Sequence, residues 1–291
     1  MDYPLQMPLH PDDRLPETPG TRHRDYILTA YPPRVSPVGR LHNATLLRWA
    51  LREHQLEAWP LLDRLRHSLG EDETVWGLKL GPAGFSVELY FYNFTANAPG
   101  NPASATRIAA ALAPTLRFPA PVDERLPYFM CSFELDSQAL RTGVAPAWRL
   151  YLGSGDRGRT QCGFSYRVEP GGLVAENHYW FYKMAEAADR DDAARRVAAS
   201  PRAGDSAGLL PAALLDCYTV CFAVKPNADG LYFSRISSPQ LADWLAPRHA
   251  TLAELLRDDS FAHLRWDLGY DFHARPGERP QLHKFAIHGV L

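Results

Sequence analysis

The chain has 291 residues, of which 46% are hydrophobic and 22% charged, and its formal net charge at pH 7 is −2. This length allows a full hydrophobic core in one large domain or two. The balanced charge argues against a basic surface for nucleic acid or an anionic membrane, and no apolar run reaches the roughly 20 residues of a transmembrane helix. The first 13 residues are acidic and proline-rich, without the basic start of a signal peptide, so we expect a cytoplasmic protein.

Four cysteines, Cys131, Cys162, Cys217 and Cys221, lie in apolar, strand-like runs. There is no CxxC motif, and no histidine stands at zinc-finger spacing from them. We therefore expect the cysteines to be small buried hydrophobic residues, and we assign no metal ligand from the sequence.

Residues 1–40 contain many prolines and few periodic apolar residues, which predicts an extended N-terminal arm on the surface of the protein. Residues 41–291 are expected to form a single domain. Its first part, 43–70, predicts two helices: leucines recur at helical spacing, Pro60 suits the first turn of the second helix, and Gly70 can end it.

Five strand–turn–strand patterns follow, each with arms rich in aromatic and β-branched residues and a connection containing Gly, Pro, Asn or Asp. Their arms are 74–80 and 85–94, 128–136 and 147–154, 162–168 and 173–184, 215–224 and 231–236, and 261–272 and 282–291. Helical patterns occupy 103–117, 185–200 and 237–260, the last with Ser237 or Ser238 as its cap.

Ten sequential antiparallel strands create an edge problem, which closure into a barrel removes. With helices covering the outside, the outward strand faces must be apolar and the polar faces must line the lumen. The fold class predicted is therefore α+β: a ten-stranded antiparallel barrel surrounded by helices.

Strand alternation gives the residues of the polar faces. They are Glu88, Tyr90 and Tyr92, Arg149 and Tyr151, Asn177 and Tyr179, Tyr232, and Lys284 and His288, with Lys79 or Lys183 as further cations. Enclosed cations need an anion such as diphosphate, and aromatic walls suit a carbocation. The alternative is that these residues decorate a solvated sheet face, where Tyr and Arg are common.

This layout, with an R-x-Y strand at Arg149, an N-x-Y strand at Asn177 and a terminal K-x-x-x-H strand at Lys284, resembles the ABBA-type aromatic prenyltransferases. Within that group it is most similar to the peptide prenyltransferases of cyanobactin-type biosynthesis. The resemblance covers residues 60–291 and is one of layout and scattered positions. It implies a barrel of five αββα-like repeats that transfers a dimethylallyl or geranyl group from its diphosphate to a nucleophilic side chain of a ribosomally made, cyclic peptide.

The resemblance also implies roles for single residues. Glu73 would be the base, and diphosphate would be bound by Arg149, Tyr151, Asn177, Tyr179, Tyr232, Lys284, Lys79 and His288, together with Mg²⁺. The prenyl and acceptor pocket would comprise Tyr90, Tyr92, Glu88, Tyr218, Val220, Phe222 and Trp266, where the small Val220 leaves depth for geranyl. We expect a monomer whose partners are the peptide and the isoprenoid diphosphate.

Three alternatives stay open at this point. Glu73 lies in an acidic run, 71–73, that is also typical of a polar turn. The acceptor is a Tyr, Trp, His or Arg side chain, a peptide terminus, or a free aromatic molecule such as an indole or phenol. A barrel that binds an apolar ligand without chemistry has the same layout.

Overall fold

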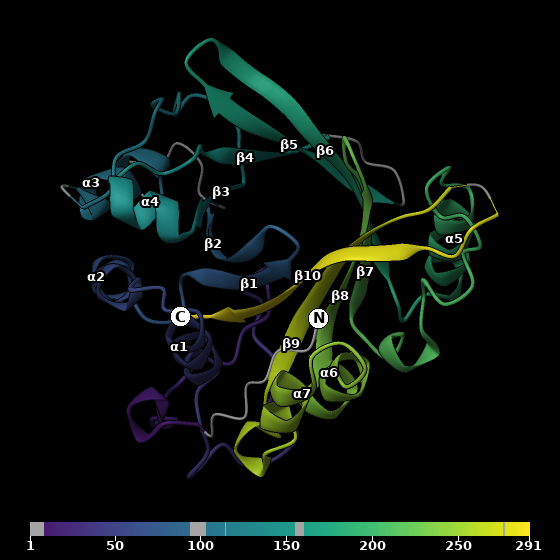
Figure 1. Ribbon diagram of the computed structural model, residues 1–291, viewed down its shortest axis with the longest axis horizontal. Coiled ribbons are helices and arrows are strands. Elements are labelled where there is room, and N and C mark those ends of the chain that lie inside the picture. The colour runs from purple at the N-terminus through teal and green to yellow at the C-terminus, as the bar shows by residue number, and fades with distance from the viewer. Residues whose placement is uncertain (1–8, 94–102, 114, 155–159, 276) are drawn as a thin grey trace.

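The computed structural model describes residues 9–93, 103–113, 115–154, 160–275 and 277–291. Its ten strands form one closed antiparallel barrel in which every strand pairs with its neighbours in the chain and the last pairs with the first. The predicted ten-stranded barrel is therefore confirmed, and Figure 1 shows it with helices around its outside.

The strands form five adjacent pairs, as the sequence predicted. They are β1 (Val75–Gly81), β2 (Gly84–Tyr92), β3 (Met130–Leu135), β4 (Arg149–Gly153), β5 (Gln161–Glu169), β6 (Gly172–Lys183), β7 (Thr219–Val224), β8 (Asp229–Ser237), β9 (Arg265–His273) and β10 (Gln281–Val290). Two predicted arms are too long at their starts, since 215–218 precede β7 and 261–264 precede β9. Phe94, predicted at the end of the second arm, lies outside the described residues.

Seven α-helices are present in the described part of the chain. They are α1 (Ala44–Glu53), α2 (Trp59–Leu69), α3 (Ala105–Leu112), α4 (Ser137–Thr142), α5 (Ala187–Ala198), α6 (Ser238–Leu245) and α7 (Ala250–Leu256). The predicted capping of α6 is confirmed, because Ser237 and Gln240 form a capping box at its start. The short α4, in the connection between β3 and β4, was not predicted. None of the described helices combines the length and apolar character needed to cross a bilayer.

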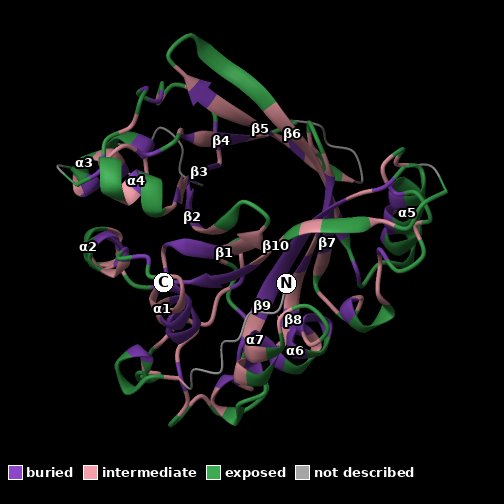
Figure 2. Ribbon diagram, viewed as in Figure 1, coloured by how far each residue is buried: buried purple, intermediate pink, exposed green. Residues whose placement is uncertain are grey.

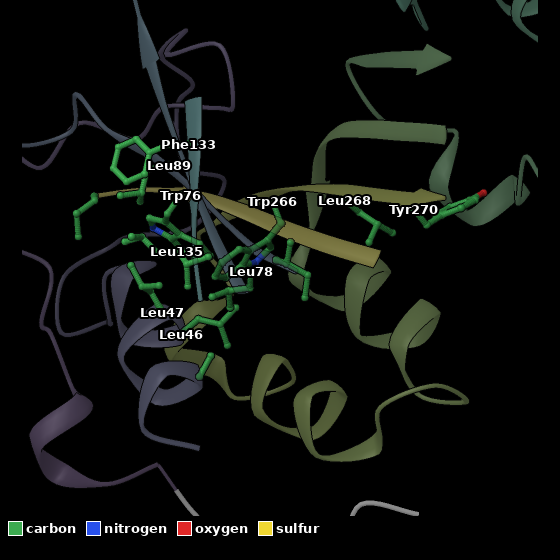
Figure 3. Packing of buried hydrophobic residues seen from close by; sticks show 14 of the residues in the cluster. Leu46, Leu47, Trp76, Leu78, Leu89, Phe133, Leu135, Trp266, Leu268 and Tyr270 are labelled. Carbon is green, nitrogen blue, oxygen red and sulfur yellow. The ribbon is translucent and has the colours of Figure 1, made fainter. Parts of the chain in front are cut away.

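The main hydrophobic core lies between these helices and the outer face of the barrel. Leu46 and Leu47 of α1 pack toward Trp76 and Leu78 of β1, and all four are fully buried (Figure 3). Figure 2 shows the same pattern over the molecule: β1 and β9 are buried along most of their length, whereas the tip of the β5–β6 hairpin is exposed. Because the outer face is apolar, the polar residues of each strand must point inward.

Three predicted pocket residues belong to this outer layer instead of the lumen. Val220 is fully buried in the core, and Phe222 packs beside Trp180, with ring centroids 6.0 Å apart. The indole N–H of Trp266 donates to Ser238 Oγ of α6 at 2.8 Å. The predicted placing of Val220, Phe222 and Trp266 in the prenyl pocket is thus wrong, because alternation in β7 and β9 turns these side chains toward the helices.

Register shifts interrupt strict alternation in three strands, β6, β8 and β10. Each shift adds one residue, which re-aims the neighbouring side chains. In β8 the extra residue is Arg235, which has a positive φ of 59°. Alternation predicted Arg235 on the outer face, but its Nε donates to Asp25 Oδ2 of the N-terminal arm at 2.7 Å.

The N-terminal arm enters one end of the barrel, in contrast to its predicted surface position; its residues 1–8 lie outside the described part. A tight turn spans 24–30, where Asp25 Oδ1 accepts hydrogen bonds from the backbone N–H groups of Ile27 and Thr29 at 3.1 and 2.9 Å. Asp25 itself is 2% exposed. The turn therefore closes part of the barrel end formed by β2, β8, β9 and β10.

Because Val220 points outward, we predict that substituting it changes the stability of the protein, whereas a residue at the floor of the pocket would change ligand preference. Val220→Phe should overfill the core beneath the helices and lower the free energy of unfolding by about 1–3 kcal/mol. Chemical denaturation measures this loss. A variant as stable as wild type, with altered ligand preference, would instead place Val220 on the lumen side.

Candidate active site in the barrel lumen

A cavity of about 1020 Å³ occupies the lumen, and all ten strands and residues 25–29 of the arm contribute to its wall. The predicted residues that line it are Lys79, Glu88, Tyr90, Tyr92, Arg149, Tyr151, Asn177, Tyr179, Lys183, Tyr218, Tyr232, Lys284 and His288. The prediction that the polar strand faces point inward is confirmed for these residues except Tyr218, which precedes β7 and lines the cavity from outside the strands. The volume of the cavity is at the upper end of the range for small-molecule sites.

Glu88 is an enclosed carboxylate of the lumen, with 3% of the residue exposed. Its oxygens contact Lys79 Nζ and accept hydrogen bonds from Tyr90 Oη at 2.8 Å and Ser132 Oγ at 2.6 Å. Arg149 Nη1 lies 3.6 Å away. Burial alone would raise the pKa of Glu88, but Lys79 and Arg149 outweigh burial and lower this pKa, so the carboxylate is ionised at neutral pH.

Two further carboxylates share the same cations. Glu134 Oε2 lies 2.9 Å from Lys79 Nζ, and Glu176 Oε2 accepts from Arg149 Nε at 2.9 Å. Glu176 is the extra residue at the β6 register shift. Burial alone would lower the pKa values of Lys79 and Arg149, but the surrounding carboxylates raise both. Lys79 and Arg149 are thus fully charged, and each is held between carboxylates.

A second charged group lies at β9 and β10. Asp271 contacts Lys225 Nζ through one oxygen and lies 3.3 Å from Lys284 Nζ through the other. Lys225 Nζ also sits 5.2 Å from the ring centroid of Tyr232. Burial lowers the pKa of Lys284, against the opposing effect of Asp271. The sequence missed Lys225, because it lies in the β7–β8 turn, where alternation makes no prediction.

Tyrosine rings form an arc across the remaining wall. Tyr26 of the arm lies edge-on to Tyr90, with centroids 5.1 Å apart, and Tyr90 and Tyr179 lie 6.5 and 6.0 Å from Tyr151. Burial raises the pKa values of Tyr90 and Tyr151 well above 10, so they remain neutral phenols. Asn177 Nδ2 donates to Tyr179 Oη at 2.7 Å. The predicted aromatic wall is present, and Tyr26 is an additional member of it.

Glycines make room for two of the lumen rings. A Cβ at Gly77 would lie 2.6 Å from His288 Cδ2, and one at Gly269 would lie 2.4 Å from Tyr232 Cδ1. Neither ring could keep its position beside a larger residue, since such contacts are shorter than any carbon–carbon contact in a packed core.

His288, predicted as a diphosphate contact, lies in the aromatic part of the lumen. Its ring packs edge-on to Tyr26, at a centroid distance of 5.0 Å, and its Nδ1–H donates to the Asp267 carbonyl at 3.1 Å. Burial lowers the pKa of His288 to about 4. It is therefore neutral near pH 7 and adds no positive charge for an anion.

Glu73, predicted as the base, lies outside the cavity. Its Oε1 pairs with Arg24 Nη1 at 3.0 Å, and its side chain is 40% exposed just before β1. Of the two, Glu88, which the sequence assigned to the pocket wall, lines the cavity, and Glu73 does not. Sequence reasoning left out Glu134, Glu176, Asp267 and Asp271, although the first and the last two follow from alternation in β3 and β9.

A magnesium ion would need oxygen ligands in the lumen. Within the described residues, only one group of three His, Cys, Asp or Glu side chains has ligand atoms that all lie within 4.8 Å of one another. This group is outside the cavity. The described lumen thus offers no protein cage for Mg²⁺. The residues fit the other common arrangement, in which the ion is held by phosphate oxygens, water and one or two carboxylates.

The chain matches no protein-family model, and a search of curated proteins finds no significant relative.

The environment of His288 predicts a pH dependence of stability. The folded pKa, about 4, lies below the ordinary 6.5, so between these values the unfolded chain binds a proton that the folded chain does not. As pH falls from 6.5 to 4, wild type should lose about 3 kcal/mol relative to His288→Phe, whose ring does not titrate. Urea denaturation of both proteins across this range measures the difference. A constant difference would show that His288 is protonated or solvated in the folded protein.

The docking of the arm predicts a large effect at Asp25. Asp25→Ala removes the partner of Arg235 and two turn hydrogen bonds, so the free energy of unfolding should fall by about 3 kcal/mol, and residues 9–40 should become sensitive to protease. The matched control is Asp243→Ala, which removes an exposed ion pair with Arg257 and should change stability by less than about 0.5 kcal/mol. Equal effects of the two substitutions would contradict the docking.

Proposed function

We propose that this chain is a prenyltransferase of the ABBA barrel type. It transfers a dimethylallyl or geranyl group from the diphosphate to a nucleophilic side chain of a ribosomally made peptide. The observation that carries the proposal is a single enclosed lumen with buried cations, an arc of tyrosine rings and an ionised carboxylate. The resemblance of the sequence to that family agrees with this choice.

In the proposed reaction the carbon–oxygen bond of the prenyl diphosphate breaks, and both electrons leave with the diphosphate. Arg149, Lys79, Lys225 and Lys284 stabilise the departing anion. The allyl cation is held against Tyr90, Tyr151 and Tyr179, whose neutral rings stabilise positive charge and shield it from water. A nucleophilic atom of the acceptor then forms the new bond to carbon.

The last step releases one proton from the acceptor. Glu88 is the proposed recipient, because it is ionised and lies in the lumen within hydrogen-bond distance of Tyr90. Its lowered pKa makes it a weak base, but bond formation makes the acceptor proton strongly acidic, so a weak base suffices. This assignment replaces the role predicted for Glu73.

A second candidate is a barrel that binds an amphiphilic ligand without chemistry. The observation that favours it is the pairing of lumen cations: Lys79 and Arg149 contact Glu88, Glu134 and Glu176. Diphosphate must compete with these carboxylates. A ligand that carries both a positive and a negative charge could bind in the lumen without displacing any of these carboxylates.

The proposal is tested by mass spectrometry of the purified protein with dimethylallyl or geranyl diphosphate, with Mg²⁺ or EDTA, and with linear peptides, cyclic peptides and free tryptophan or tyrosine. A mass gain of one prenyl unit on a peptide is the expected result, and fragmentation locates the acceptor residue. Gain only on free amino acids would support the small-molecule alternative. Donor binding by calorimetry without any product would favour the non-catalytic barrel, and no binding of either diphosphate would contradict the proposal.

Variants separate the roles within the lumen. Arg149→Ala should weaken donor binding at least tenfold, since it removes a charge-assisted contact, whereas the control Arg195→Ala, at an exposed position of α5, should leave binding unchanged. Glu88→Gln should reduce turnover more than a hundredfold with donor affinity kept within a few-fold, and Glu73→Gln should retain turnover. The reverse order of the two Gln variants would return the base role to Glu73.

A further inference from the structure

Three side chains with metal-binding atoms converge outside the lumen, between the arm and the start of β9. Glu17 and His23 belong to the arm, and His263 lies just after the 3₁₀ turn Asp259–Phe261. Glu17 Oε1 lies 3.3 Å from His23 Nε2 and 2.8 Å from His263 Nε2. The side chains of Glu17, His23 and His263 are 3%, 9% and 0% exposed. Such a buried convergence of two imidazoles on one carboxylate oxygen needs an explanation.

The hydrogen bonds within the cluster do not satisfy its polar atoms. Glu17 Oε2 is buried and has no hydrogen-bond partner among the described residues. A buried carboxylate oxygen without a partner is costly, because it has lost its water and gained nothing in exchange. A cation bound at Oε1 could take Oε2 as a second ligand and remove this cost. His263 Nδ1 is also unpaired in the described structure, and the cation does not explain that atom.

We propose that Glu17, His23 and His263 bind a divalent transition-metal ion, with Zn²⁺ as the best fit. Two imidazole nitrogens and a carboxylate are an established Zn²⁺ donor set, and the two Glu17 oxygens bring the number of ligand atoms to four. At a tetrahedral angle, two ligand atoms of zinc lie about 3.3 Å apart, as follows from metal–ligand distances of about 2.0–2.1 Å. The 3.3 Å contact already has this spacing, and the 2.8 Å contact has to open by about half an ångström. The two oxygens of one carboxylate are closer together than this spacing, so the site would be a distorted tetrahedron.

The ion would fix the arm at a position that matters for the lumen. His23 directly precedes the turn at 24–30, and its carbonyl accepts from the backbone N–H of Tyr31 at 2.9 Å, on the far side of that turn. The Tyr31 hydroxyl in turn accepts from the backbone N–H of Arg265 at 2.9 Å. A metal that ties His23 to His263 would therefore hold both ends of the turn against the start of β9.

The test begins with metal-free protein, dialysed against EDTA and then buffer. Titration with Zn²⁺ in a calorimeter should give one site, and Co²⁺ should give the intense visible absorption of a tetrahedral complex. Zn²⁺ should also raise the Tm, because it binds the folded arrangement of residues that are 246 positions apart in the chain. Wild-type protein that binds neither ion would overturn the proposal and leave a hydrogen-bonded cluster only.

Variants assign the binding to these residues. Glu17→Gln keeps the shape of the side chain, and His23→Gln keeps a polar group in the arm; each should weaken Zn²⁺ binding at least tenfold and abolish the Tm shift. The control is His273→Gln, which alters the other close histidine pair, His273 and His283, in the β9–β10 hairpin and should leave binding unchanged. Loss of binding in His273→Gln, with binding kept in His23→Gln, would place the ion elsewhere.

Discussion

The pairing of β1 with β10 closes the sheet, and the rest of the structure depends on that closure. The ladder runs from the pair Val75 and Val290 to the pair Leu80 and Phe285, and the backbone N–H of Leu291 extends it by donating to the Thr74 carbonyl at 2.7 Å. A closed sheet gives every strand two neighbours and only two environments, one beneath the helices and one in the lumen. Since the helices present apolar residues, the polar half of each strand has to share the enclosed space.

That enclosed space is stable only because its charges are partnered. Removing Lys79, Arg149 and Glu88 from water would be prohibitive for each alone, and their mutual contacts offset much of the cost. The partners differ in exposure: the Glu88 side chain is 4% exposed, whereas the Glu134 and Glu176 side chains are 26% and 18% exposed. An anion that enters the lumen would therefore compete first with the two outer carboxylates for the cations. The resting charge balance is compatible with anion binding for this reason.

The sequence predicted the barrel and most of its lining, because alternation is a local property of each strand. Tyr90, Arg149 and Tyr232 face the lumen as expected. The errors arose where alternation has no defined phase or is interrupted. Val220 is one such case: β7 begins only at Thr219, so the longer predicted arm did not define which residues point inward. Arg235 is another, because it lies at a bulge with a positive φ that its residue type does not predict.

Contacts between distant parts of the chain could not be predicted in the same way. Lys225 reaches the lumen from a turn, and the convergence of Glu17 with His263 joins positions 246 residues apart. The spacing of single residues contains no information on either contact. Each depends on how the barrel twists and on where the arm crosses it. Glu73 is the reverse case: the family resemblance implied that it is the base, but its carboxylate pairs with Arg24 of the arm outside the lumen.

The arm illustrates how a segment that resembles a linker can be part of a site. Its prolines and lack of periodic apolar residues are typical of an exposed connection, yet Asp25 is almost fully buried and pairs with Arg235 of β8. The adjacent Tyr26 donates its backbone N–H to Asp267 of β9 at 3.0 Å and packs its ring on Tyr90 of β2. These contacts reach three strands at once, so the position of the arm depends on the closed barrel. The aromatic end of the lumen is therefore completed by residues that contribute nothing to the sheet itself.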